Sequence, residues 1–112
     1  MKFGVNYTPS HGWFHAWLDP DWDGIDNDLK QISELGMDHV RIFPIWPYLQ
    51  PNRTWINKKG VADVRRMVHI AGEHGLDAYV DVFQGHLSSF DFLPSWLVTW
   101  LSLIHISEPT RL

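Results

Sequence analysis

Short apolar runs alternate along the chain with longer stretches in which apolar residues recur every three or four positions. The short runs, at 2–7, 39–43 and 78–83, have the length and the flanking turn residues of β-strands. The longer stretches between them have the spacing of helices that bury one face. We therefore expect the order strand, helix, strand, helix, strand.

Turn and cap residues set the expected limits of the two helices. The first has Asp19 as its cap and Pro20 as its first residue, and Gly36 ends it. The second has Asn57 near its start and Gly75 just beyond its end. After the second strand, prolines predict a long irregular loop that runs to the start of the second helix. The apolar positions with helical spacing are Trp22, Ile25, Leu29 and Ile32, then Val61, Val64, Val68 and Ala71.

This order of elements is typical of parallel βαβ units, so the expected fold class is α/β. The segment 34–38 (Glu-Leu-Gly-Met-Asp) has a counterpart 39 residues later at 73–77 (Glu-His-Gly-Leu-Asp). Turns from a helix to a strand generally favour such a glycine. The repeated segment is consistent with one βα unit that occurs twice, as in a barrel or a doubly wound sheet. No Gly-x-Gly-x-x-Gly follows the first strand, which weakens the dinucleotide-binding alternative.

Composition narrows the function classes. The 112 residues are 45% hydrophobic and 20% charged, as in a soluble globular protein. A complete (β/α)₈ barrel needs about 250 residues, so that fold could be present only in part. The net charge is −4 and the basic residues are scattered, so no nucleic-acid partner is expected. Without cysteine there is neither a disulfide framework nor a thiolate metal site.

Other partners and locations can be considered from local features. No apolar signal segment follows Met1, so a cytoplasmic location is the default expectation and an extracellular one stays open. The most apolar stretch, 93–106, is shorter than the ~20 residues that span a bilayer, so no membrane partner is expected. His11 and His15 are four residues apart, but Gly12 disfavours a helix there and no third ligand is evident. We expect no metal and no cofactor.

Three segments carry a resemblance to a known family. They are 4–7 (Gly-Val-Asn-Tyr), 36–42 (Gly-Met-Asp-His-Val-Arg-Ile) and 75–81 (Gly-Leu-Asp-Ala-Tyr-Val-Asp). Together they resemble the first three βα units of glycoside hydrolase family 5 and its clan relatives, over residues 2 to about 100. The most specific part is Val-Arg-Ile-Phe at 40–43, followed by Trp46 and Leu-Gln-Pro at 49–51. The resemblance implies an incomplete TIM (β/α)₈ barrel. In such a barrel Val5, Ile42 and Val82, or their immediate neighbours, would point toward the barrel axis.

Arg41 lies in an apolar strand, where a guanidinium covered on both faces must be paired. A structural ion pair, with Asp81 as one candidate partner, would satisfy it. The functional alternative is a cation that holds a nucleophilic carboxylate ionised and oriented. The resemblance implies this second role, because these enzymes place an arginine at the end of strand 2 beside the nucleophile. We therefore assign Arg41 to support of the nucleophile.

Aromatic residues cluster in the loops that a barrel brings to its C-terminal face, where sugar rings can stack. Packing on the barrel rim is the alternative for each of them. The resemblance also implies a histidine after strand 3 that touches sugar hydroxyls. Phe83 stands at the nearest aligned position, which shifts this match to His86. The expected substrate-binding residues are Trp13, Phe14, Trp17, Trp46, Gln84 and His86, whereas the helical spacing of Trp22 places it in the core.

The implied function is hydrolysis of O-glycosidic bonds in a carbohydrate substrate. The resemblance implies a retaining mechanism, in which two carboxylates stand ~5 to 5.5 Å apart. In the family these carboxylates follow strands 4 and 7, so no acid of this chain is assigned to either role and the chain alone is expected to be inactive. The alternative from another class is a small non-catalytic carbohydrate-binding or interaction module. A different barrel enzyme is a third reading, which the absence of metal and phosphate motifs disfavours.

The end of the chain has a different character. Residues 101–111, Leu-Ser-Leu-Ile-His-Ile-Ser-Glu-Pro-Thr-Arg, resemble the translation of a transposase adapter used in preparing sequencing libraries. We therefore expect residues 1–100 to form part of the barrel domain and residues 101–112 to be a non-native tail. A native amphipathic strand is the alternative interpretation of the tail.

Overall fold

The computed structural model describes residues 2–82, 86–87, 90–91 and 93–99. The tail at 101–112 therefore lies outside the described residues. In chain order the elements are β1 (Gly4–Tyr7), the 3₁₀ helix η1 (Trp13–Leu18), α1 (Trp22–Glu34), β2 (His39–Ile42), α2 (Trp46–Leu49), α3 (Lys58–Glu73), β3 (Asp77–Val80), β4 (His86–Leu87) and β5 (Phe90–Asp91). Residues 95–99 are helical.

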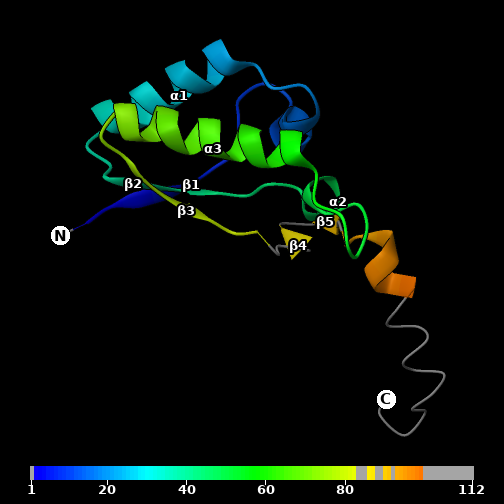
Figure 1. Ribbon diagram of the computed structural model, residues 1–112. Coiled ribbons are helices and arrows are strands. Elements are labelled where there is room, and N and C mark those ends of the chain that lie inside the picture. Colours follow the sequence, from blue (N-terminus) through cyan, green and yellow to red (C-terminus); the bar gives the residue numbers. More distant parts are fainter. Residues whose placement is uncertain (1, 83–85, 88–89, 92, 100–112) are drawn as a thin grey trace, which may run out of the picture.

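Strands β1, β2 and β3 form one sheet in that order, and both pairings are parallel. The register places Asn6, Arg41 and Tyr79 in one row across the sheet. The long helices α1 and α3 both lie against the same face of this sheet (Figure 1). The α/β class and the parallel order of these three strands are confirmed, and both connections between them contain a helix.

The core fills the space between the sheet and the two helices. Val40 and Ile42 point from β2 into this layer, where they are buried with Leu29 of α1 and with Met67 and Ala71 of α3. Because successive strand residues point to opposite faces, the residues between them lie on the other side of the sheet. Trp22 is half-buried against this core, and the Arg66 guanidinium lies over its ring at 4.4 Å.

The face away from the helices carries a different set of residues. Val5 and Ile42 belong to the helix-side core, so of the two expected sets it is their immediate neighbours that lie on the face away from the helices. Their neighbours Asn6 and Arg41 occupy that face instead, in the same row as the exposed ring of Tyr79. Two residues earlier along these strands, where Gly4 pairs with His39, the His39 ring occupies the space that a Cβ on Gly4 would need.

One of the expected helix starts needs correction, since α1 begins at Trp22 and not at Pro20. Asp21, not Asp19, caps α1, since its side chain accepts a hydrogen bond from the Gly24 N–H. Asp19 instead ends η1, with its N–H donating to the Ala16 carbonyl. The expected cap Asn57 is confirmed at α3, where it accepts from the N–H groups of residues 59 and 60.

The proline-rich connection after β2 is also more regular than expected. It contains the single-turn helix α2, because Pro47 lies in the first turn, where no helical N–H partner is lost. Gly36 and Gly75 follow α1 and α3 with φ of 91° and 75°, as the helix ends predicted. In the part of the chain that the structure describes, no helix is long and apolar enough to cross a membrane.

The open sheet face generates a prediction for residues 1–112 expressed alone. We expect self-association, because the edges of β1 and β3 and the face around Tyr79 are not covered by the described residues. Size-exclusion chromatography with light scattering should show concentration-dependent species, together with a broad thermal transition. Tyr79→Lys should reduce the association more than the control Leu35→Lys, which removes a still more exposed apolar residue at the end of α1. A monomer with a sharp, cooperative transition would instead favour a self-contained module.

Candidate functional site

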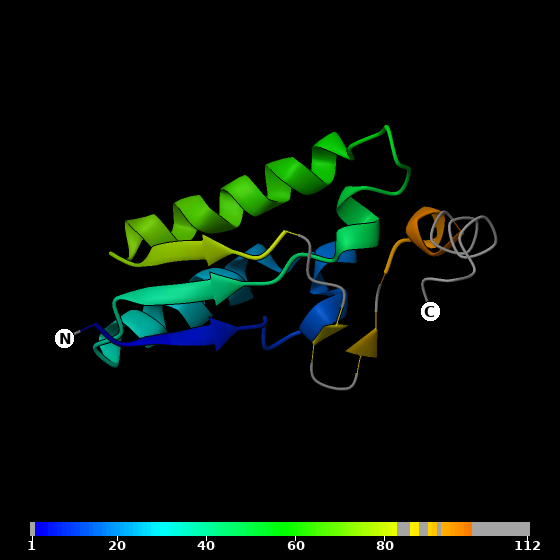
Figure 2. The ribbon, with the colours of Figure 1, turned by 90° about the horizontal axis from the view of Figure 1, so that it is seen from below.

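The three parallel strands end along one edge of the sheet. Tyr7, Ile42 and Val80 are the last residues of β1, β2 and β3, and the chain beyond each strand leads to η1, to α2 and to β4 (Figure 2). In α/β folds this carboxyl-end edge is where ligands bind, because the variable loops gather there. The expected site residues follow or end these same strands.

Arg41 forms an ion pair with Asp81 across the sheet. Its Nη2 lies 2.6 Å from Asp81 Oδ2, and the guanidinium lies 5.3 Å from the centre of the Phe43 ring. Apart from this charge contact, Asp81 Oδ2 has no hydrogen-bond partner in the described part of the chain. In the part of the chain that the structure describes, the Arg41 side chain is 50% exposed on the face away from the helices. The ion pair with Asp81, which was expected if Arg41 is structural, is present. The role of Arg41 beside a nucleophile stays a prediction.

The aromatic residues after β1 lie in η1 but differ in accessibility. Trp13 is 43% exposed, whereas Trp17 is 3% exposed and belongs to the core. The indole N–H of Trp17 donates to the Phe43 carbonyl at 3.0 Å, so this ring joins η1 to the end of β2. Trp17 therefore cannot offer its face to a sugar, which corrects the expectation for it. For Phe14 the structure describes the backbone alone.

Trp46 begins α2 and takes part in a second aromatic contact. Its indole N–H donates to Gln50 Oε1 at 3.0 Å, and its ring meets the edge of Trp96 with 6.2 Å between centroids. The Trp96 indole N–H in turn donates to the Gln50 carbonyl at 2.8 Å. This cluster holds the chain after β2 against residues 95–99. Gln50 and Trp96 had not been expected in this role, because no short-range spacing connects them.

Two expected binding residues follow β3. Gln84 lies outside the described residues, and His86 is described by its backbone alone, as the first residue of β4. Their contacts with a sugar stay predictions.

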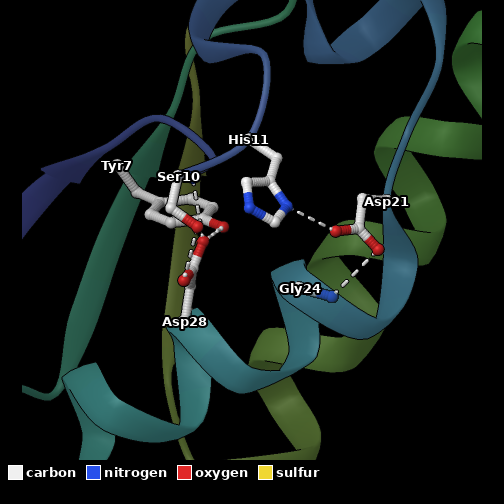
Figure 3. A network of polar contacts seen from close by, with 6 residues as sticks. All are labelled: Tyr7, Ser10, His11, Asp21, Gly24 and Asp28. Carbon is white, nitrogen blue, oxygen red and sulfur yellow. Dashed lines mark hydrogen bonds and ion pairs between the residues drawn. The ribbon is translucent and has the colours of Figure 1, made fainter.

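Asp28 of α1 is the centre of a polar network that sequence reasoning missed (Figure 3). The Tyr7 hydroxyl donates to Asp28 Oδ2 at 2.9 Å, and the Ser10 N–H donates to the same oxygen at 3.0 Å. The Ser10 hydroxyl donates to Oδ1 at 3.0 Å. Burial, and then the hydrogen bond and charge of Asp28, raise the pKa of the Tyr7 hydroxyl well above its ordinary value of 10.0. The phenol therefore remains a donor throughout the neutral range.

A second contact lies one step further along the same loop. His11 Nδ1 lies 2.8 Å from Asp21 Oδ2, while the other oxygen of Asp21 caps α1 (Figure 3). The His11 contact, followed by the Gly24 N–H, lowers the pKa of Asp21. Among the described residues no three His, Cys, Asp or Glu side chains are grouped to hold a metal ion.

Comparison with known proteins shows which family the chain resembles. No family model matches the chain. A solved GH5_18 structure from Bifidobacterium longum subsp. infantis shares 81% sequence identity with it, over 89% of this chain and 24% of that protein, with a TM-score of 0.86. The chain is glycoside hydrolase family 5-like.

Other glycosidases support the same conclusion for this GH5-like chain. A GH5_18 structure from Streptomyces cattleya, solved in complex with Manβ1-4GlcNAc, is 58% identical over 88% of this chain, with a TM-score of 0.85. Cellodextrinase A from Ruminococcus flavefaciens is 31% identical over 67 residues. The chain spans about a quarter of the GH5_18 structures and 20% of the cellodextrinase. It corresponds to the N-terminal part of a TIM barrel, as the sequence implied.

The raised pKa of Tyr7 generates a prediction for the protein that contains this GH5-like chain. An unfolded tyrosine loses its proton near pH 10, whereas the folded state holds the Tyr7 proton to higher pH. Its contribution to the free energy of unfolding is therefore complete below about pH 10 and falls as the pH rises further. Urea unfolding of the wild type and of Tyr7→Phe between pH 8 and 11 should show a stability difference that narrows above about pH 10. A difference that stays constant to pH 11 would contradict the assignment.

Proposed function

We propose that this chain supplies the first three βα units of a glycoside hydrolase that cleaves O-glycosidic bonds with retention of configuration. The observation that carries the proposal is the 81% identity with the GH5_18 structure over 89% of this chain. The family resemblance supports a nucleophile and an acid/base that follow strands 4 and 7. Two carboxylates ~5 to 5.5 Å apart would form and then hydrolyse a glycosyl-enzyme intermediate.

In this proposal Arg41 acts through the nucleophile. A guanidinium at the carboxyl end of β2 favours the ionised form of a neighbouring carboxylate and fixes its orientation. Asp81, 2.6 Å from Nη2, limits the directions that the guanidinium can take. The side chain is still half-exposed in the described part of the chain, so donors remain for a further acceptor. Arg41 can therefore pair with Asp81 and also contact the nucleophile.

The substrate we propose is a β-linked mannoside with an N-acetylglucosamine neighbour. Support comes from the Streptomyces cattleya relative, which was solved with Manβ1-4GlcNAc and with GlcNAc. The exo-β-1,4-mannosidase Op5Man5 from an Opitutaceae bacterium is also similar, at 29% identity over 86% of this chain. Trp13 and Trp46, which stand after β1 and β2, supply aromatic surface for stacking of such sugars. Gln84 and His86 remain the proposed hydroxyl-binding residues after β3.

The proposal predicts the activity of the full-length protein. It should release mannose from Manβ1-4GlcNAc, and proton NMR during the first turnovers should detect the β-anomer, because double displacement retains configuration. Residues 1–112 alone should release none, since stacking without a carboxylate pair supplies neither nucleophile nor proton donor. Turnover by the isolated chain that disappears on mutation of one of its own acids would refute this division of roles. An α-anomer as first product would refute the retaining mechanism.

A separate prediction concerns Arg41 in the full-length protein. Arg41→Ala should lower kcat by about two to three orders of magnitude, the range seen when one charge-assisted contact at a reacting centre is lost. Arg41→Lys should rescue little, because a point charge does not reproduce the planar fork. The thermal midpoint should change far less than kcat, because the apolar core on the helix side of the sheet does not include this side chain. Equal losses of activity and stability in both variants would show that Arg41 is structural.

A further inference from the structure

The loop after β1 is fastened to α1 at two places. Asp28 accepts three hydrogen bonds, from the Tyr7 hydroxyl and from the backbone N–H and hydroxyl of Ser10. At the N-cap of α1, seven residues before Asp28, Asp21 contacts His11 at 2.8 Å. Asp21 at the cap of α1 and Asp28 within α1 both contact residues of this loop (Figure 3). The loop therefore leaves the sheet along a path that α1 determines.

The Asp28 anchor is tied to the core of the molecule. The Tyr7 ring is 6% exposed and packs in the same cluster as Leu29, which follows Asp28 in α1. A hydroxyl on a buried ring has little freedom, so it fixes the position of the carboxylate to which it donates. Ser10, by contrast, is exposed, and both of its donors reach this fixed carboxylate. Through Asp28, the buried Tyr7 side chain therefore fixes the position of Ser10 in the surface loop.

The backbone directly after these anchors adopts an unfavourable conformation. Gly12 has φ of 87°, and Trp13 has φ of 51°, the one positive value at a non-glycine residue in the described part of the chain. A left-handed conformation places the Cβ of an L-residue too close to its carbonyl oxygen, so it persists only where neighbouring contacts hold it. The contacts that precede Trp13 are those of Ser10 and His11. The 43% exposed indole of Trp13 stands just beyond them.

We propose that Asp28 is a positioning residue for sugar binding, which holds the loop so that Trp13 presents its ring at the carboxyl-end edge of the sheet. The inference rests on the proposed function, because the sugar that Trp13 would stack against is the substrate of that function. Asp28 itself does not touch the ligand. Its hydrogen bonds to Ser10 and Tyr7 determine the direction in which the chain enters η1.

Steady-state kinetics of the full-length protein with Manβ1-4GlcNAc test this role. Stacking stabilises substrate and transition state alike, so its loss raises KM and leaves kcat largely unchanged. We expect Asp28→Ala and Trp13→Ala each to raise KM by about tenfold. The double variant should be no worse than the single ones, because both changes remove the same contact. Asp28→Asn, which keeps one acceptor oxygen, should recover part of the loss.

A matched control lies on the same helix. Asp26 also projects from α1 and lies 2.8 Å from His74 Nε2 after α3, away from the loop. Asp26→Ala should therefore lower stability slightly without changing KM. Thermal midpoints measured for every variant separate folding from binding. If Asp28→Ala does not fold, Ser10→Ala supplies the test, since it removes one of the three hydrogen bonds from an exposed residue.

The outcomes separate the two claims. A wild type that neither hydrolyses Manβ1-4GlcNAc nor binds mannose in calorimetry would overturn the proposed function itself. An active wild type in which Asp28→Ala keeps the KM of the Asp26→Ala control would overturn the positioning role alone. Additive effects of Asp28→Ala and Trp13→Ala would also overturn it, since they would show that the two residues act independently.

Discussion

Successive residues of β2 point to opposite faces of the sheet, and these two faces have entirely different neighbours. Val40 and Ile42 are buried beneath α1 and α3, which fixes the register of β2 against both flanking strands. A slip of one residue would bring Arg41 into the apolar layer and expel Ile42. Burial on the helix side therefore decides that Arg41 lies on the opposite face, where it reaches Asp81 at the end of β3.

The strands and long helices could be predicted because their signals are local. Helical spacing, the cap Asn57 and the two glycines after the helices act within one or two turns of the chain. The errors arose where two local signals competed. Asp19 and Asp21 are both suitable helix caps, but Asp19 is the C-terminal cap of η1 and Asp21 caps α1. A proline in the first turn likewise permits a helix such as α2, so Pro47 did not enforce an irregular loop.

The candidate site was predicted less completely because its contacts join distant parts of the chain. Arg41 and Asp81 could be paired in advance, since both stand near the ends of strands expected to be neighbours. Residue type alone could not separate Trp13 from Trp17, which differ in burial although they share one turn-rich segment. Nor could any spacing rule connect Asp28 with Tyr7 and Ser10, which lie 21 and 18 residues away in the sequence.

Helix α1 has a geometric consequence for how this part of the molecule can vary. Asp21 caps α1 and Asp28 lies seven residues later, close to two helical turns, and both contact the loop after β1. One inserted or deleted residue between them would rotate Asp28 by about 100° relative to Asp21. The loop would then lose one fastening while keeping the other. The number of residues between the cap of α1 and Asp28 is therefore constrained by the loop that both acids contact, in addition to the packing of the helix on the sheet.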